Sequence, residues 1–150
     1  MIMKLLRTRV VAVALFSMAT LACAQIKVDN AWVRATVPGQ QATGAFMKIT
    51  SIEAVKLSSV SSPAASISEI HEMKMDGGVM KMRALPSGLD IPANRAVELS
   101  SGGFHVMMMD LKQTISAGQS VPLELQFTNA KGHKTSVSVA AKAGFTDPYK

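Results

Sequence analysis

The sequence has a single cysteine, Cys23, and it lies in a segment that we do not expect in the mature protein. Residues 1–24 have a basic head without acidic residues, an apolar run too short to cross a bilayer comfortably, and the small-residue motif Ala22-Cys23-Ala24. This pattern predicts a signal peptide cleaved after Ala24, and hence export to the periplasm. A lipoprotein signal would instead acylate Cys23, but Thr20 occupies a position where such signals carry a bulky aliphatic residue.

Loss of the only thiol restricts the chemistry of the mature chain. We expect it to have no disulfide, and the loss of cysteine argues against a blue-copper electron-transfer site, which requires a cysteine thiolate. Removal of Lys4, Arg7 and Arg9 lowers the formal charge from +6 to +3, too mild an excess to suggest a nucleic-acid partner. We expect a monomer with no stable membrane insertion after cleavage of the signal.

Nothing in the sequence points to an enzyme. It lacks a Ser-His-Asp spacing, a glycine-rich phosphate loop and a supported pair of acids, and three histidines leave little for acid–base catalysis. Apolar segments are short and separated by turn residues, with no sustained helical period, as in all-β proteins. We predict a cupredoxin-like or Greek-key β-sandwich of eight or nine strands at residues 25–142, followed by a loose tail at 143–150.

Methionine and histidine are concentrated in one part of the chain. Eight methionines follow residue 24, and seven of them lie between residues 73 and 109. Alternate residues of a strand share a face, so His71, Met73 and Met75 should point one way. The same holds for His105, Met107 and Met109, while a turn at 76–78 could return Met80 and Met82 beside the first strand.

Two interpretations of this cluster remain open at the level of the residues. Methionine fills cores well, and the chain has only five Phe, one Trp and one Tyr. Thioether sulfur is also a soft, neutral ligand that suits Cu(I), and imidazole binds copper as well. Because thiolates are readily oxidised outside the cytoplasm, methionine would supply sulfur ligands without that risk. We expect Met47 and Met108 to be core residues, Trp32 to pack in or at the rim of the core, and His133 to be exposed.

The chain resembles the periplasmic copper chaperone family PCuAC, whose members have a cupredoxin-like β-sandwich. The family pattern is a His, a Met about ten residues on and, after a little over twenty more, a His-x-Met. Here ten residues separate His71 from Met82, and 22 separate Met82 from His105, which precedes Met107 by two positions. The segments AWVRATVPGQQATGAFMKI, GLDIPANRAVEL and GGFHVMMMDL also match. Asn94 replaces a common glycine, and Asn also tolerates the left-handed conformation.

The resemblance implies a ligand set and a role. It assigns Cu(I) to His71, Met82, His105 and Met107, with Met73, Met75, Met80 and Met109 as substitutes or surrounding residues. It further implies that the protein passes copper toward cytochrome c oxidase, with a Sco-like thioredoxin-fold protein and oxidase subunit II as recipients. A copper-sequestering or resistance protein, and a structural β-sandwich with a Met-rich core, are the alternatives.

Overall fold

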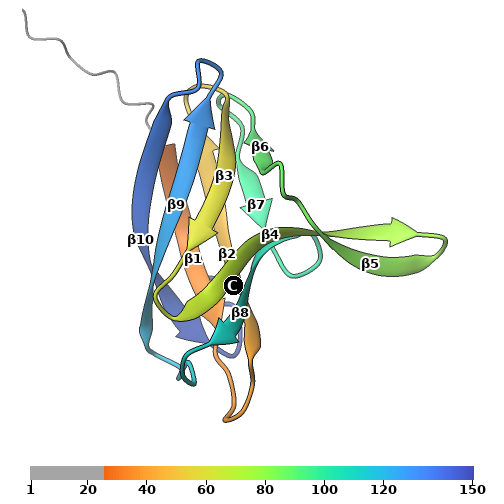
Figure 1. Cartoon of the computed structure of the whole chain (residues 1–150), viewed down its shortest axis with the longest axis vertical. Helices are drawn as coiled ribbons and strands as arrows, with labels where there is room; N and C mark the ends of the chain where they lie inside the picture. The colour runs from red at the N-terminus through yellow and green to blue at the C-terminus, as the bar shows by residue number, and fades with distance from the viewer. Residues whose placement is uncertain (1–25) are drawn as a thin grey trace, which may run out of the picture.

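The computed structural model describes residues 26–150, whose regular structure consists of ten β-strands (Figure 1). The predicted signal peptide at residues 1–24, Cys23 included, lies outside the described residues. In the described part of the chain, no helix is long and apolar enough to cross a bilayer. The strands are β1 (Ile26–Arg34), β2 (Ala42–Ser51), β3 (Val55–Ser61), β4 (Ala65–Asp76), β5 (Val79–Ala84), β6 (Leu89–Ile91), β7 (Val97–Leu99), β8 (Phe104–Leu111), β9 (Ser120–Asn129) and β10 (Lys134–Gly144).

The all-β prediction is confirmed, but the expected count of eight or nine strands is too low. Nine strands coincide with the short apolar segments that turn residues separate in the sequence. The additional strand, β6, pairs with β3 and has only three residues. It lies between Gly88 and Pro92, where the sequence shows mainly turn residues, and its pairing with β3 joins segments about 30 residues apart in the chain.

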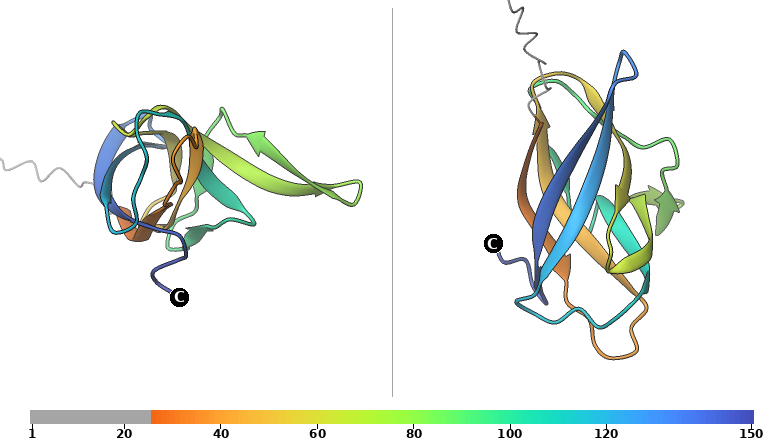
Figure 2. Two further views of the ribbon diagram at one scale, coloured as in Figure 1. Left: turned by 90° about the horizontal axis from the view of Figure 1, so that it is seen from below. Right: turned by 60° about the vertical axis from the view of Figure 1, so that its left-hand side comes forward.

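Hydrogen bonds join the strands in the order β5-β4-β8-β2-β1-β10-β9-β3-β6, and β7 pairs with the part of β2 that β8 leaves free. The pairing of β1 with β10 is parallel, and the other strand pairs are antiparallel. The sheet curls until β3 packs beside β4, which gives the body the rounded cross-section seen from below in Figure 2. This arrangement leaves one element, the β4–β5 hairpin, outside the body (Figure 1).

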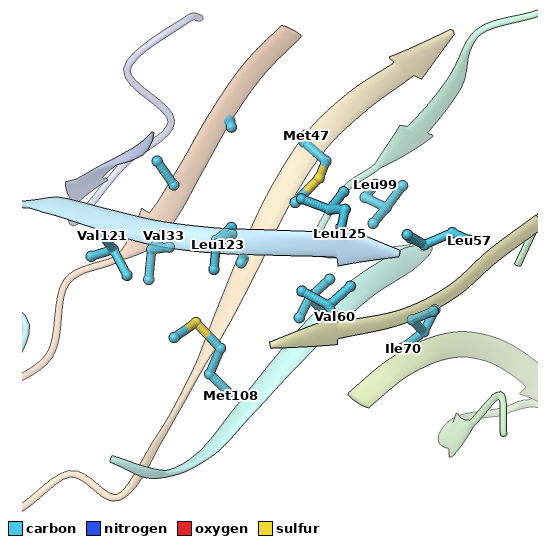
Figure 3. Packing of buried hydrophobic residues seen from close by; sticks show 14 of the residues in the cluster. Val33, Met47, Leu57, Val60, Ile70, Leu99, Met108, Val121, Leu123 and Leu125 are labelled. Atoms are coloured by element: carbon cyan, nitrogen blue, oxygen red, sulfur yellow. The ribbon is translucent and has the colours of Figure 1, made fainter. Parts of the chain in front are cut away.

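The core lies inside the curled sheet and contains two of the methionines. Met47 and Met108 are almost completely buried among leucine and valine side chains from β1, β3, β7 and β9 (Figure 3). Val106 and Ile70 belong to the same cluster, so the inward residues of β8 alternate with His105 and Met107. The prediction that Met47 and Met108 are core residues is confirmed.

A β-bulge in β1 determines which side of the sheet its later residues face. The register with β2 shifts between Asp29 and Trp32, and Asn30 adopts a φ of 53°. Beyond the bulge, Ala31 and Val33 join the core, so Trp32 lies on the outer face, where it is buried against Phe46 with 4.7 Å between ring centroids. The extra residue therefore places an aromatic pair outside the core.

The C-terminal boundary differs from the predicted one at residue 142. β10 continues to Gly144, and Ala143, which pairs with Val33, is buried. The residues that follow β10 are not entirely loose, because the Tyr149 hydroxyl donates a hydrogen bond of 3.5 Å to the Ala31 carbonyl oxygen. Asn94 has a φ of 57°, in the left-handed region that Asn tolerates.

Core and surface methionines should differ sharply in their effect on stability. Replacement of the buried Met108 by Ala should lower the free energy of unfolding by about 2–5 kcal/mol, because it leaves a cavity in the core. The same replacement at the half-exposed Met82 should change it by less than about 0.5 kcal/mol. Urea denaturation of the metal-free variants measures both values. Equal losses at the two positions would contradict the assignment of Met82 to the surface.

Candidate metal site

Antiparallel pairing of β4 with β8 places the two candidate histidines side by side. His71 is directly opposite His105, and Glu69 is opposite Met107. The imidazole rings meet edge to face with 5.8 Å between centroids, and both residues are buried. They lie on the outer face of the sheet, since their neighbours Ile70 and Val106 point into the core.

The β4–β5 hairpin brings the third candidate to the same place. Gly77 and Gly78 form its turn with φ values of 58° and 79°, a conformation that glycine adopts without strain. The resulting register sets Met82 opposite Met73 and Met80 opposite Met75. Met82 therefore comes back along β4 toward the histidines, as the turn signal in the sequence predicted.

Most of these side chains line one surface hollow of about 250 Å³. Three of the four predicted ligands, Met82, His105 and Met107, line it, and so does Met73. His71 is not part of the lining but lies immediately beside His105. The other lining residues are Arg34, Gln40, Thr43, Gly44, Phe46 and Ser101.

The hydrogen bond of His71 fixes the protonation pattern of its ring. Nε2 lies 2.8 Å from the Glu69 carboxylate, which can only accept, so Nε2 carries the proton. In the neutral ring Nδ1 then holds a free lone pair. Within residues 26–150 this buried atom has no hydrogen-bond partner. A buried acceptor without a partner costs free energy, and a metal ion is one group that would satisfy it.

A hydrogen bond also fixes which ring nitrogen of His105 carries the proton. Its Nδ1 donates to the Gly103 carbonyl oxygen at 3.2 Å, which leaves Nε2 as the lone-pair nitrogen. Burial lowers the pKa of His105 below its usual value of 6.5, and the nearby His71 lowers it further, although the Gly103 hydrogen bond acts in the opposite direction. The neutral imidazole is therefore favoured at neutral pH, and this is the form that binds metals.

An aromatic side chain supports the hollow from β2. Phe46 lies 6.5 Å from His105 between ring centroids, and the Arg34 guanidinium carbon lies 5.7 Å from the centre of the Phe46 ring. A Cβ atom on Gly44 would come within 2.8 Å of that ring, so only glycine leaves room for it. Sequence analysis did not find Phe46, Arg34 or Gly44, because their approach depends on the pairing of β2 with β1 and β8.

The remaining candidates lie outside the hollow. Met75 and Met80 form the outer methionine pair of the hairpin, separated from its turn by the pair Asp76–Val79. Met109 is partly buried on β8, beyond Met107 as seen from the hairpin, and pairs with Ile67 and Ala42. His133 is exposed in the turn between β9 and β10, as predicted.

The donors of this site are neutral and partly soft. No acidic side chain is among the described residues that line the hollow, and residues 26–150 contain no group of three His, Cys, Asp or Glu arranged to hold a metal. Thioethers and imidazoles together suit Cu(I), whereas Mg²⁺ and Ca²⁺ prefer oxygen ligands. The arrangement is thus suited to a soft monovalent ion held by few bonds near the surface.

Comparison with known proteins identifies relatives along most of the chain. A family model described as "Putative lipoprotein LpqE-like" matches residues 26–139. The "Putative lipoprotein Lxx21020" of Leifsonia xyli subsp. xyli (strain CTCB07) is 32% identical over 125 residues, which cover 83% of this chain and 75% of that protein.

Solved structures share the fold. Cu(I)-bound DR1885 from Deinococcus radiodurans is 27% identical with a TM-score of 0.61, over 86% of this chain and 83% of that chain. The copper-bound PCuAC domain from PmoF2 is 20% identical with a TM-score of 0.60, over 82% of this chain and 97% of that chain. The predicted cupredoxin-like β fold is confirmed by these similarities.

The lowered pKa of His105 should make the metal-free protein less stable in mild acid. Below about pH 6.5 the unfolded chain binds a proton at this position that the folded protein resists. The free energy of unfolding should therefore fall as the pH decreases from 7 through 6.5 toward the folded-state pKa of His105. Denaturation at several pH values, with NMR titration of the ring, checks this prediction. The dependence should be weaker in His105→Gln, and a folded-state pKa above 6.5 would contradict the account.

Proposed function

This chain belongs to the LpqE-like family, and we propose that it is an exported, non-enzymatic carrier of Cu(I). The observation that carries the proposal is the hollow in which three thioethers and an imidazole meet beside a buried His71 nitrogen without a partner among residues 26–150. We assign the ion to His71, Met82, His105 and Met107. His71 does not line the hollow itself, but its ring packs against that of His105 with 5.8 Å between centroids.

The positions of the methionines support a metal site over a Met-rich core. Met75, Met80 and Met82 are 59%, 45% and 49% exposed, and of the seven clustered methionines only Met108 lies in the core. Side chains this exposed gain little by packing, so filling the core does not explain their presence. The structural β-sandwich with a Met-rich core is therefore the weaker alternative.

The charge of the site favours a monovalent ion. The proposed ligands include no anionic donor, Arg34 lines the hollow, and the nearby Glu69 carboxylate is already bound to His71 Nε2. A Cu(I) complex would carry one positive charge next to that guanidinium, whereas a divalent ion would carry two and be repelled more strongly. The similarity to Cu(I)-bound DR1885 supports the same choice of metal.

We further propose that the protein delivers its ion instead of storing it. The side chain of Met82 is half exposed, so an incoming protein can reach it and ligands can be exchanged one at a time. A Sco-like thioredoxin-fold protein and cytochrome c oxidase subunit II are the proposed recipients. Copper sequestration is the alternative, and a protein that binds Cu(I) but releases none to such recipients would favour it.

Removal of both sulfur ligands should abolish copper uptake without unfolding the protein. The wild-type protein should take one tightly bound equivalent of Cu(I) from a coloured chelator. Met82→Leu combined with Met107→Leu should weaken this binding by more than about 100-fold, because loss of a mere supporting residue around a metal already costs 10–100-fold. Competition with the chelator measures the affinity, and circular dichroism checks the fold.

The matched control replaces the same residue type by leucine outside the hollow. Met75→Leu combined with Met80→Leu should retain the first equivalent with wild-type affinity. A wild-type protein that ignores Cu(I), together with an unfolded Met82/Met107 variant, would instead favour the core interpretation.

Export makes a separate prediction about the N-terminus. Cleavage after Ala24 should give a mature chain that begins at Gln25 and is recovered in the periplasmic fraction. Intact-mass spectrometry of the protein purified from its native host measures the cleavage site directly. A diacylglycerol-modified Cys23 in the membrane fraction would contradict the prediction and support the lipoprotein alternative.

A further inference from the structure

The β4–β5 hairpin has two chemically different faces. Alternation along the strands places Met73 and Met75 on one face, and the register sets Met82 and Met80 directly opposite them. The other face carries two ion pairs, Arg83 with Glu72 and Lys81 with Asp76, at 2.8 Å and 2.7 Å. The hairpin therefore presents a ladder of two methionine pairs along one face.

Packing against the core does not account for the methionines on this face. The hairpin extends away from the body, so its faces are not packed against the core (Figures 1 and 2). Every residue of β5 is exposed, as are Met75 and the turn. An exposed two-stranded ribbon is only marginally stable and gains nothing from flexible thioethers in place of β-branched residues.

The outer pair has the geometry of a small metal site. Residues directly opposite each other in an antiparallel pair have Cβ atoms about 5 Å apart, which lets two long flexible methionines reach a common ion. The inner pair, Met73 and Met82, begins two residues closer to the body, or about 7 Å along the strand. Met82 and Met73 also line the hollow that holds the proposed Cu(I) site.

We propose that Met75 and Met80 form a second, weaker Cu(I) site at the tip of the hairpin, through which the ion enters or leaves the main site. Two thioethers hold the ion at the tip. Met73 and then Met82 replace them one at a time, and His105, Met107 and His71 complete the binding. Copper remains Cu(I) throughout, the thioethers carry no proton to lose, the imidazoles bind in their neutral form, and each bond that breaks is replaced by a bond to the next sulfur or nitrogen.

The affinities of the two sites follow from their donors. The tip offers only two thioethers exposed to water, whereas the main site offers two thioethers together with two buried imidazoles. The first equivalent of Cu(I) should therefore occupy the main site and the second the tip. The direction of transfer rests on the proposed function, but the existence of the tip site is tested without it.

NMR of the mature protein labelled with ¹³C in the methionine methyl groups distinguishes the sites. Anaerobic titration with Cu(I), which is diamagnetic, should shift the Met82 and Met107 signals during the first equivalent. The Met75 and Met80 signals should shift only during the second. In Met75→Leu combined with Met80→Leu the second step should be lost and the first unchanged, and capture of Cu(I) from a chelator should be slower.

The matched control is Met109→Leu, the same chemical change beyond Met107 on β8, which should retain both steps and the wild-type capture rate. The inference is overturned if the Met75 and Met80 signals never move, if they move together with those of Met82 during the first equivalent, or if their replacement leaves the second step intact. Shifts at Met75 and Met80 without any at Met107 would support the tip site and reject the proposed main site. If the methionine face is instead a docking surface for a partner protein, Cu(I) should leave the Met75 and Met80 signals unmoved, which is the first of the outcomes that overturn the inference.

Discussion

The antiparallel register between β4 and β8 is the constraint on which the rest of the candidate site depends. It sets His71 opposite His105 and, because side chains alternate along a strand, puts Met107 on their face while Val106 and Met108 enter the core. A slip of one residue would turn the histidines from the outer face into the core and turn the apolar residues of β8 outward. Burial of the apolar residues of these strands therefore also fixes the positions of the proposed metal ligands.

The side chains of the candidate site are imidazoles, an aromatic ring and thioethers, each positioned by a neighbouring group. Acceptor groups from Glu69 and the Gly103 backbone fix the ring protons of the two histidines and leave one nitrogen of each free. Phe46 packs beside His105 in the space that Gly44 leaves open. The hairpin then adds sulfur from outside the body, so the site combines a rigid, buried half with an exposed half. Such a combination suits an ion that must be held selectively and also released.

Local patterns in the sequence were sufficient to predict much of this arrangement. Alternation separated Met108 from Met107, and the glycine turn predicted that Met82 returns beside β4, because both depend on residues close in the chain. The three-residue strand β6, the extension of β10 to Gly144 and the approach of Arg34 and Phe46 depend on pairings between distant segments. The bulge at Asn30, which turns Trp32 outward, could not be predicted either, since a single Asn in a strand does not by itself indicate a bulge.

The central claim is that thioether sulfur and imidazole nitrogen bind one Cu(I) ion together. X-ray absorption spectroscopy of the mature protein loaded with one equivalent of Cu(I) tests this claim most directly, because it distinguishes sulfur from nitrogen neighbours of the metal. The account predicts a mixed shell with sulfur from Met82 and Met107 and nitrogen from His71 and His105. A shell of nitrogen and oxygen alone would contradict it.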